Sequence, residues 1–470
     1  MGLGKRSPRR WLATVTAAAM AVTGAAFAVV TAGPASAAAT YPLKVSANNR
    51  YLVGANNQPF YFAADTGWFM LENATAADFD NYLSNRAAKG FTTVMVMAPH
   101  HWTERNRAGQ LPFTTAGNIS TPNNAWWAHM DAFVDKARAR GLAVNMGLVW
   151  LGYKNEEWGN GQLARNSIAA ATGFGQFIGR RYASGARNNV IFQMGGDANP
   201  NAATRDRINA IANGIRSVNG SVPITAHTAP GAEARPVYSS NAGWMNVNNI
   251  YTYYPEKGSG TRYPYAMARD AYLRNPAMPF VLIESGYEGD GASPAYVRAE
   301  QYWPVLSGGA GFAYGNRDIW PVSDSQYGRN GQAWQNHLND RGAVSAGHAA
   351  RVMQSRAWHN LVPDYGHTTV TGGYGTFNNT RNRGGADYVT AARTGDGRLV
   401  MAYVPSTGTN ARTLTVNMAR LSVNPASAKW FNPANGTYTT IGSFANTGSR
   451  NFTTPGNNGQ GMNDWLLILE

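Results

Sequence analysis

Apolar and polar positions follow a repeating rhythm between residues 60 and 356. Apolar runs of strand length, such as Phe91–Ala98, alternate with segments whose apolar residues recur at helical spacing. The segment before Phe91 begins with a capping-box pair, Thr75 and Asp78, and ends at Gly90, as a helix does. The predicted strands end near residues 65, 98, 149, 197, 227, 253, 284 and 314. Eight strands that alternate with helices predict an α/β fold, a (β/α)8 TIM barrel, which needs about 250 residues.

The pattern changes on both sides of this rhythm. Tyr41–Asn57 alternates weakly around asparagine pairs, which predicts a short hairpin. Beyond Leu361, short alternating runs flank Asp396-Gly397 and Asn435-Gly436, and both dipeptides are hairpin signals. We therefore expect a barrel domain over residues 41–356 and a C-terminal antiparallel β-sandwich over residues 361–470.

Residues 1–37 predict a segment that is not part of the fold. Basic residues are followed by an apolar run from Trp11 to Val30 and by Ala35-Ser36-Ala37, a small-residue cleavage site. This pattern is typical of a secretory signal peptide, so we expect a secreted, extracellular protein. Arg9-Arg10 also fits twin-arginine export, which leaves the route open. No later apolar run reaches membrane-spanning length, so no membrane partner is expected after cleavage.

The composition excludes several kinds of chemistry. The chain has no cysteine, which excludes disulfides, thiol nucleophiles and thiolate metal sites. Its formal net charge is +14, and basic charge attracts nucleic acid or uronic-acid polymers. Only 14% of the residues are charged, however, and no stretch after the leader clusters lysine and arginine. We therefore expect ordinary surface arginines and no nucleic-acid partner, while the oligomeric state stays open.

Two predicted strands each end in a single acid. The apolar run Val190–Met194 leads through two glycines to Asp197, and the run Phe280–Ile283 ends in Glu284. Runs that are apolar throughout are typical of strands buried on both faces in a parallel sheet. The acids belong to the fourth and seventh strands, and barrel active sites lie at the carboxyl ends of the strands. We therefore expect the two acids to face each other across the mouth.

A facing pair of carboxylic acids suits the hydrolysis of a glycosidic bond. One acid protonates the leaving oxygen, and the other acts as a nucleophile or activates water. Aromatic side chains at the mouth suit a sugar, whose C–H face stacks on an indole while fixed polar groups bind its hydroxyls. The other residues expected at the strand ends are Asp65, Trp102, Trp150, His227, Tyr253, Tyr314, Asn316 and Trp320.

Other interpretations of these residues stay open. Carboxylates at strand ends also cap helices or pair with arginine, the tryptophans also serve as packing, and His227 also fits a buried core position. Glu288 is a rival nucleophile with a structural loop role as its alternative. His100-His101 could indicate a metal, but Ala63-Ala64-Asp65 lacks the His-x-His of barrel metallohydrolases, so we expect neither a metal nor a cofactor. An esterase would need a G-x-S-x-G elbow, which is absent.

Several stretches in series resemble one family. They are FYFAADTGWFML, NYLSNRAAKGFTTVMVM, VDKARARGLAVNMGLVW, GRRYASGARNNVIFQMGGD, PITAHTAPG, PFVLIESGYEG, GGAGFAYGNRDIW, WFNPANGTY and NDWLLIL. Together they resemble the apiosidase-like glycoside hydrolases, secreted (β/α)8 enzymes with an appended β-sandwich. The resemblance covers essentially the whole chain after the leader.

The resemblance implies roles for individual residues. It implies a retaining glycosidase with Asp197 of GGD as acid/base and Glu284 of ESGYEG as nucleophile. The DTGW stretch implies that Asp65 and Trp68 line the subsite of the terminal sugar, with His227 as a neighbour. The best-known family substrate is apiose, a furanose of pectin side chains, and related members act on other glycosides. A furanosidase is thus the finer expectation, and hydrolysis of a plant or microbial glycoside is the coarser one.

Two expectations depend on details beyond the resemblance. Asp197 is one methylene shorter than the glutamate of many retaining barrel enzymes, so retention needs a closer backbone, which the two glycines permit. The alternative function is a non-catalytic polysaccharide-binding protein on a degenerate barrel, with the sandwich as the binding domain. The sandwich itself resembles a domain sometimes labelled collagen-binding, but its turns and tryptophans do not indicate that function.

Overall fold

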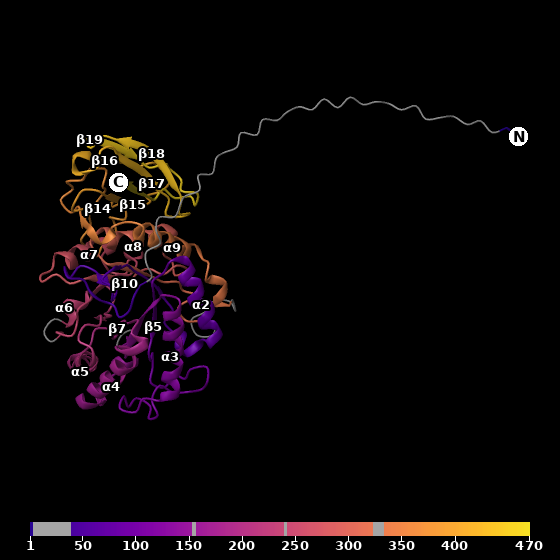
Figure 1. The fold of residues 1–470 in the computed structure, drawn as a ribbon, viewed down its shortest axis with the longest axis vertical. Helices are drawn as coiled ribbons and strands as arrows, with labels where there is room; N and C mark the ends of the chain where they lie inside the picture. Colours follow the sequence, from indigo (N-terminus) through magenta and orange to yellow (C-terminus); the bar gives the residue numbers. More distant parts are fainter. Residues whose placement is uncertain (3–38, 153–156, 239–241, 323–332) are drawn as a thin grey trace. The chain divides into compact units, whose positions relative to one another are not determined.

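Eight parallel strands form the central sheet of the computed structural model (Figure 1). They are β4 (Phe62–Thr66), β5 (Thr93–Met97), β6 (Ala143–Leu148), β7 (Val190–Met194), β8 (Ile224–Ala226), β9 (Asn248–Tyr251), β10 (Phe280–Glu284) and β11 (Gly311–Tyr314). Their hydrogen-bonded order is β8-β7-β6-β5-β4-β11-β10-β9. The backbone N–H groups of Asn246 and Val247 donate to the Ile224 carbonyl at 3.1 and 3.2 Å, which joins the two ends of the sheet. The predicted (β/α)8 barrel is confirmed.

Side chains alternate between the inside and the outside of the barrel. Phe62 and Ala64 of β4 belong to the same buried cluster as Met95 and Met97 of β5, and this cluster fills the interior. The residues between them pack outward against the helices, because successive side chains of a strand point to opposite faces. This alternation determines which residues at the strand ends can reach the mouth.

The helices that follow the strands cover the outside of the barrel (Figure 1). They are α1 (Met70–Asn73), α2 (Ala76–Lys89), α3 (Asn124–Ala139), α4 (Ile168–Tyr182), α5 (Ala202–Val218), α6 (Ala234–Tyr238), α7 (Pro264–Leu273), α8 (Pro294–Leu306) and α9 (Arg341–Gln354). Helix α2 confirms the predicted signals, since Thr75 and Asp78 form a reciprocal capping box and Gly90 ends the helix with φ +93°. The left-handed φ explains why a glycine stands there.

A small sheet closes the other end of the barrel. It consists of β1 (Lys44–Val45), β2 (Leu52–Val53) and β3 (Pro59–Phe60), paired antiparallel in the region of the predicted hairpin. Leu43, Leu52 and Phe60 belong to the interior cluster of the barrel. Because β3 runs directly into the start of β4, this apolar sheet covers the amino ends of the strands and leaves the mouth at their carboxyl ends.

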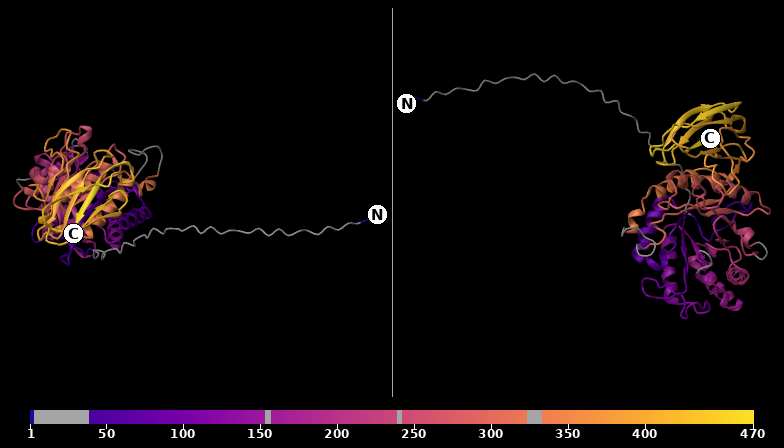
Figure 2. Two further views of the ribbon diagram at one scale, coloured as in Figure 1. Left: turned by 90° about the horizontal axis from the view of Figure 1, so that it is seen from above. Right: turned by 180° about the vertical axis from the view of Figure 1, so that it is seen from behind.

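The C-terminal part contains two antiparallel sheets, as predicted. The larger has the order β12-β14-β15-β20-β17-β18, and the smaller has the order β13-β16-β19. The strands are β12 (Leu361–Pro363), β13 (Val370–Gly372), β14 (Thr390–Thr394), β15 (Val400–Val404), β16 (Thr413–Asn417), β17 (Ala426–Phe431), β18 (Tyr438–Phe444), β19 (Ser449–Thr453) and β20 (Trp465–Leu469). Both predicted hairpin turns are confirmed, with Gly397 at φ +73° and Gly436 at φ +76°. Figure 2 shows these strands in two further views.

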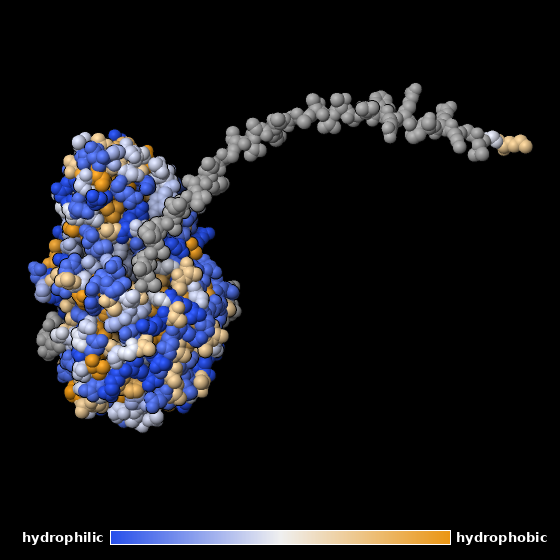
Figure 3. Space-filling model, in the orientation of Figure 1, coloured by the Kyte–Doolittle hydropathy of each residue, from blue (hydrophilic) through white to orange (hydrophobic). Residues whose placement is uncertain are grey.

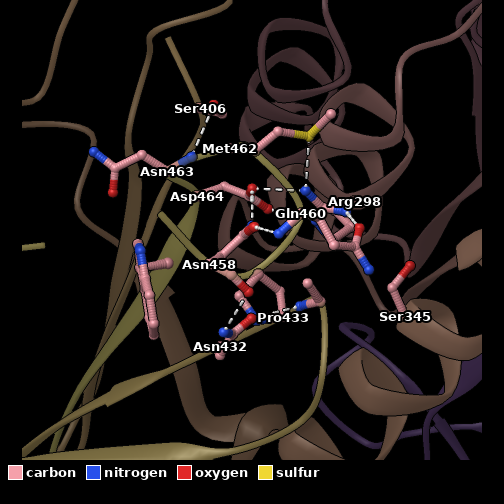
Figure 4. Close-up of polar contacts among 12 residues, drawn as sticks. Arg298, Ser345, Ser406, Asn432, Pro433, Asn458, Gln460, Met462, Asn463 and Asp464 are labelled. Atoms are coloured by element: carbon pink, nitrogen blue, oxygen red, sulfur yellow. Dashed lines mark hydrogen bonds and ion pairs between the residues drawn. The ribbon is translucent and has the colours of Figure 1, made fainter. Parts of the chain in front are cut away.

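A buried ion pair joins α8 to the C-terminal sheets, within the compact unit Ser36–Glu470. Arg298 of α8 donates from Nε and Nη2 to the two carboxylate oxygens of Asp464, at 2.6 and 2.8 Å (Figure 4). Asn458 and Tyr403 donate to the same carboxylate. The side chains of Arg298 and Asp464 are 1% and 0% exposed, so the loss of either partner would leave a buried charge without its counterion.

The structure describes residues 1–2, 39–152, 157–238, 242–322 and 333–470. The predicted signal peptide lies almost wholly outside these residues and stays a prediction. Within the described ranges, no helix combines the length and apolar character that a membrane crossing requires. On the face drawn in Figure 3, hydrophilic residues predominate and hydrophobic residues are scattered among them.

Candidate active site

The turn after β7 brings Asp197 to the mouth of the barrel. Gly195 has φ +70°, a left-handed conformation that glycine adopts without strain, and Asp197 itself has φ +54°. A Cβ on Gly196 would lie 2.2 Å from the Trp150 indole, so this position accepts only a glycine. The two glycines thus let the backbone pass against Trp150 and turn. The short aspartate side chain ends partly exposed at the mouth.

A bulge at the end of β10 turns Glu284 toward the same place. Leu282 pairs with Ile250 and Glu284 pairs with Tyr251, so Ile283 is an extra residue on β10. Without the bulge, alternation would turn Glu284 away from the interior, because Ile283 already packs inside. Bulges re-aim side chains in this way beside active sites. Glu284 therefore lies next to Tyr251, an interior residue of β9, and is 7% exposed.

The two acids and one histidine form a tight cluster. One side-chain oxygen each of Asp197 and Glu284 and one ring nitrogen of His227 all lie within 4.8 Å of one another. His227 Nε2 lies 2.7 Å from Glu284 Oε2, and the Tyr287 hydroxyl donates to Glu284 Oε1 at 2.7 Å. The Tyr251 hydroxyl donates to Asp197 Oδ1 at 3.1 Å. Both acids are thus held by neighbouring side chains.

The surroundings raise the pKa of Asp197 to about 7. Burial is the largest cause and the negative charge of Glu284 is the second, while His227 and the Tyr251 hydrogen bond act in the opposite direction. Within the described residues, neither acid forms an ion pair with an arginine or lysine. Asp197 is therefore protonated up to about neutral pH, as a general acid must be.

The same three residues are the ones that a metal ion could use. His227 Nε2 and Glu284 Oε2 are 2.7 Å apart, which is a hydrogen-bond distance. Two ligands of one zinc ion each lie about 2.0–2.2 Å from the ion and are farther apart than this in a tetrahedral arrangement. The geometry therefore fits a hydrogen bond between His227 and Glu284 better than two ligands of one metal ion.

Three aromatic residues expected at the mouth lie beside this cluster. The ring centroids of Trp68 and Trp150 are 4.8 Å apart, and Trp150 lies 5.0 Å from His227. Trp68 Nε1 donates to the Tyr287 hydroxyl at 2.8 Å. Tyr253 is half-buried and donates to Asp290 at 2.7 Å, and burial, Asp290 and the charges of both acids raise its pKa.

Two other predicted tryptophans lie on the loops around the mouth. Trp102 stacks on His101 with 3.8 Å between ring centroids and contacts Trp158 at 5.2 Å. Trp320 packs against Phe69 at 5.2 Å. Both tryptophans are partly exposed, and their role in sugar binding stays a prediction.

The structure corrects the prediction for Asp65. This side chain points outward from β4, because Phe62 and Ala64 fill the inward positions. Its carboxylate accepts a hydrogen bond from the Tyr82 hydroxyl at 2.5 Å and pairs with Arg86 at 3.0 Å, both on α2. Asp65 is 0% exposed and cannot line a sugar subsite.

Tyr314 and Asn316 are corrected for the same reason. Ala313 takes the inward position, so Tyr314 points outward and its hydroxyl donates to Glu288. The Asn316 side-chain amide donates to the Tyr314 hydroxyl at 3.1 Å and to Asp340 at 3.0 Å. Glu288 also accepts from the backbone N–H of Gly342 at the start of α9. These contacts give Glu288 a structural role.

His100 and His101 have separate partners. His100 Nε2 lies 2.6 Å from Glu157 Oε1, while His101 Nδ1 lies 2.8 Å from the Thr103 hydroxyl. The charge of Glu157 is also among the causes that raise the pKa of Asp197. The side chains of the two adjacent histidines therefore contact different residues.

Tyr251 and Tyr287 also contact the two acids, although neither residue was expected there from the sequence pattern. The signal for Tyr287 was present, since it lies three residues after Glu284 in the ESGYEG stretch. Tyr251 ends β9 two residues before Tyr253, the tyrosine that the strand-end pattern indicates. Only the bulge on β10 shows that Tyr251 is the neighbour of Glu284.

Comparison with known proteins decides the family. Residues 46–360 match the model of the apiosidase-like catalytic domain, which is more than half of the chain. The chain belongs to the apiosidase-like family. It is therefore a glycoside hydrolase, and a carbohydrate is its substrate. Residues 377–470 match a putative collagen-binding domain of a collagenase.

Solved structures agree with the fold of this apiosidase-like protein. One described as a glycoside hydrolase is 23% identical with a TM-score of 0.77, covering 92% of this chain and 98% of its own. A glycoside hydrolase family 5 protein from Bacteroides vulgatus is 22% identical with a TM-score of 0.78, covering 92% and 95%. The chain matches none of the curated proteins with which it was compared.

Proposed function

We propose that this apiosidase-like enzyme is a retaining glycoside hydrolase with Asp197 as acid/base and Glu284 as nucleophile. The observation that carries the proposal is the separation of the two acids, whose nearest oxygens lie within 4.8 Å. Retaining enzymes hold their carboxyl groups about 5–5.5 Å apart, whereas inverting enzymes need about 6.5–9.5 Å to admit a water molecule. The short spacing therefore supports double displacement.

The two residues take different parts in the proposed reaction. Glu284 attacks the anomeric carbon and forms a glycosyl ester, while the Asp197 proton passes to the departing glycosidic oxygen. Asp197, now a carboxylate, then takes a proton from the water that attacks the ester and frees Glu284. The pKa of about 7 supports Asp197 as the proton carrier.

The finer substrate assignment rests on the family. We propose a glycoside of plant or microbial polysaccharide as the substrate, with a furanoside such as an apioside as the first candidate. The leader sequence supports secretion, which would bring the enzyme to such polymers. The aromatic side chain of Trp150 lies 5.0 Å from His227, which supports a sugar as the ligand of this site.

A substrate screen tests this proposal. The purified protein is incubated with 4-nitrophenyl furanosides and pyranosides and with plant and bacterial polysaccharides, beside Glu284→Gln as the matched control. We expect the wild type to release product from at least one of them and the variant to release none. Binding without turnover across the panel would instead support the non-catalytic alternative.

A further inference from the structure

Glu284 is held at both of its carboxylate oxygens. His227 Nε2 contacts Oε2, and the Tyr287 hydroxyl donates to Oε1, each at 2.7 Å. The His227 contact depends on the proton arrangement of its ring, because Nδ1 lies near both the Asp197 N–H and the Thr228 carbonyl. The Tyr287 contact has no such freedom.

The direction of the Tyr287 contact is fixed by Trp68. The Trp68 indole can only donate a hydrogen bond, and its Nε1 lies 2.8 Å from the Tyr287 hydroxyl. In the 2.7 Å contact between Tyr287 and Glu284, the Tyr287 hydroxyl is the donor and the Glu284 carboxylate oxygen is the acceptor. A chain of donors thus runs from Trp68 through Tyr287 to Glu284, and each bond in it polarises the next.

This chain is buried and permanently protonated. Trp68 is 2% exposed and Tyr287 is 7% exposed. Burial and then the charge of Glu284 raise the pKa of Tyr287 well above its usual value, so the donor persists at every working pH. The Trp68 ring is also covered by Trp150, which leaves little of its surface for stacking on a sugar.

We propose that Tyr287 and Trp68 are positioning residues for the nucleophile, with Trp68 acting through Tyr287. The inference rests on the proposed role of Glu284. It assigns Trp68 to the orientation of Glu284 rather than to the sugar-stacking surface of the site. Trp68 follows the first barrel strand and Glu284 ends the seventh, so the contact also ties two sides of the mouth together.

A double-mutant cycle tests the chain, using the 4-nitrophenyl glycoside that the wild type cleaves fastest. Tyr287→Phe removes one donor from a catalytic charge, so we expect kcat to fall about 10²-fold with little change in KM. Trp68→Phe keeps an aromatic ring and acts one step away, so we expect about a 10-fold fall. In the Tyr287→Phe background, Trp68→Phe should have no further effect, because its partner is already gone.

The control is Tyr314→Phe, which removes an equally buried hydroxyl that donates to Glu288, outside the site. We expect its kcat to stay within about twofold of wild type, since it touches no reacting group. Equal losses from Trp68→Phe in both backgrounds, or a loss that appears mainly in KM, would overturn the proposal and make Trp68 a sugar platform.

A spectroscopic measurement separates this inference from the proposed function. The indole ¹⁵N–¹H signal of Trp68 is recorded in the wild type and in Tyr287→Phe. We expect it to move upfield and to exchange faster with solvent in the variant, whether or not any glycoside is cleaved. An unchanged indole signal would refute the chain, whereas an inactive wild type with a shifted signal would refute only the glycosidase assignment.

Discussion

Asp65 and Asp197 stand at the ends of two barrel strands, yet they have opposite surroundings. Asp65 ends in an outward position on β4, where Arg86 neutralises it inside the protein. Asp197 lies beyond the end of β7, where two glycines turn it inward beside a second acid. One carboxylate is matched by a cation and completes the structure. Among the described residues no arginine or lysine pairs with the other carboxylate, and burial together with the charge of Glu284 raises its pKa to about 7.

The difference distinguishes two kinds of acid in the barrel: acids that pair with an arginine and stabilise the structure, and acids whose pKa is raised. A guanidinium faces the buried acid and forms an ion pair with it at Asp65 and at Asp464. Without a guanidinium, burial and a like charge keep the proton on the acid until neutral pH. Perturbed pairs of this second kind are typical of functional sites.

The largest loss of activity is expected when the carboxylate of Glu284 is removed. Glu284→Gln removes the proposed nucleophile while it keeps the size of the side chain. We expect kcat to fall by about 10⁵-fold or more on every glycoside, including activated ones. Initial rates on aryl glycosides and unactivated glycosides check this, and a variant that keeps substantial activity on activated substrates would contradict the nucleophile role.

Asp197→Ala should produce a smaller and selective loss. General acid catalysis contributes about 10²–10⁴-fold, and a poor leaving group depends on it most. We expect unactivated glycosides to lose this factor, while glycosylation by activated aryl glycosides is spared. Azide should restore turnover of the activated substrates, because it replaces the base-assisted water. Equal losses on both kinds of substrate would exclude the acid/base assignment.

Asp65→Asn should damage stability rather than chemistry. It leaves the buried Arg86 guanidinium without its counterion, which destabilises a protein by about 3–5 kcal/mol. Urea unfolding should show this loss, while kcat/KM per folded molecule stays unchanged. Asp80→Asn is the matched control, because Asp80 pairs with Lys136 and Arg140 at the surface, where solvent screens an ion pair and the loss of stability should be small.

The pH dependence of kcat/KM tests the protonation state of Asp197. Asp197 holds its proton below a pKa of about 7 and loses it above, so kcat/KM on unactivated glycosides should fall above about pH 7. The alkaline limb should be missing when Asp197→Ala acts on activated substrates. The Asp197 carboxyl, followed by ¹³C NMR, should titrate at lower pH in Glu284→Gln, because the substitution removes the negative charge of Glu284, which raises the Asp197 pKa. An unchanged titration would disprove the coupling.

Much of the fold followed from apolar periodicity and turn chemistry. Continuous apolar runs of strand length predicted the eight barrel strands, because a parallel sheet between helices is buried on both faces. Asp396-Gly397 and Asn435-Gly436 marked real hairpins, because the left-handed φ of each glycine is a local requirement. Each of these sequence signals depends only on residues within or next to the strand or turn that it predicts.

The site was only partly predictable, because side-chain direction depends on phase and pairing. Ala64 and Ala313 point into the barrel, so their neighbours Asp65 and Tyr314 point outward. The expectation that residues at strand ends face the mouth did not take this alternation into account. Glu284 faces inward only because of the bulge at Ile283, which arises from pairing with β9. No local pattern announces that bulge, so Tyr251 was missed as well.

The contact between Asp65 and Arg86 could not be predicted from the sequence either. The residues are 21 positions apart in the sequence, and nothing in either stretch announces their pairing. The partner of a buried acid therefore had to come from the structure. The family resemblance assigned Asp65 to the sugar subsite, and the geometry of β4 and α2 corrects that assignment.

The stereochemistry of hydrolysis shows directly whether Glu284 acts as the nucleophile. An aryl glycoside that the enzyme cleaves is followed by ¹H NMR from the first turnovers, before the released sugar mutarotates. With acid oxygens within 4.8 Å, we expect the first sugar released to have the same anomeric configuration as the substrate. First appearance of the opposite anomer would show a single displacement by water and would contradict Glu284 as the nucleophile.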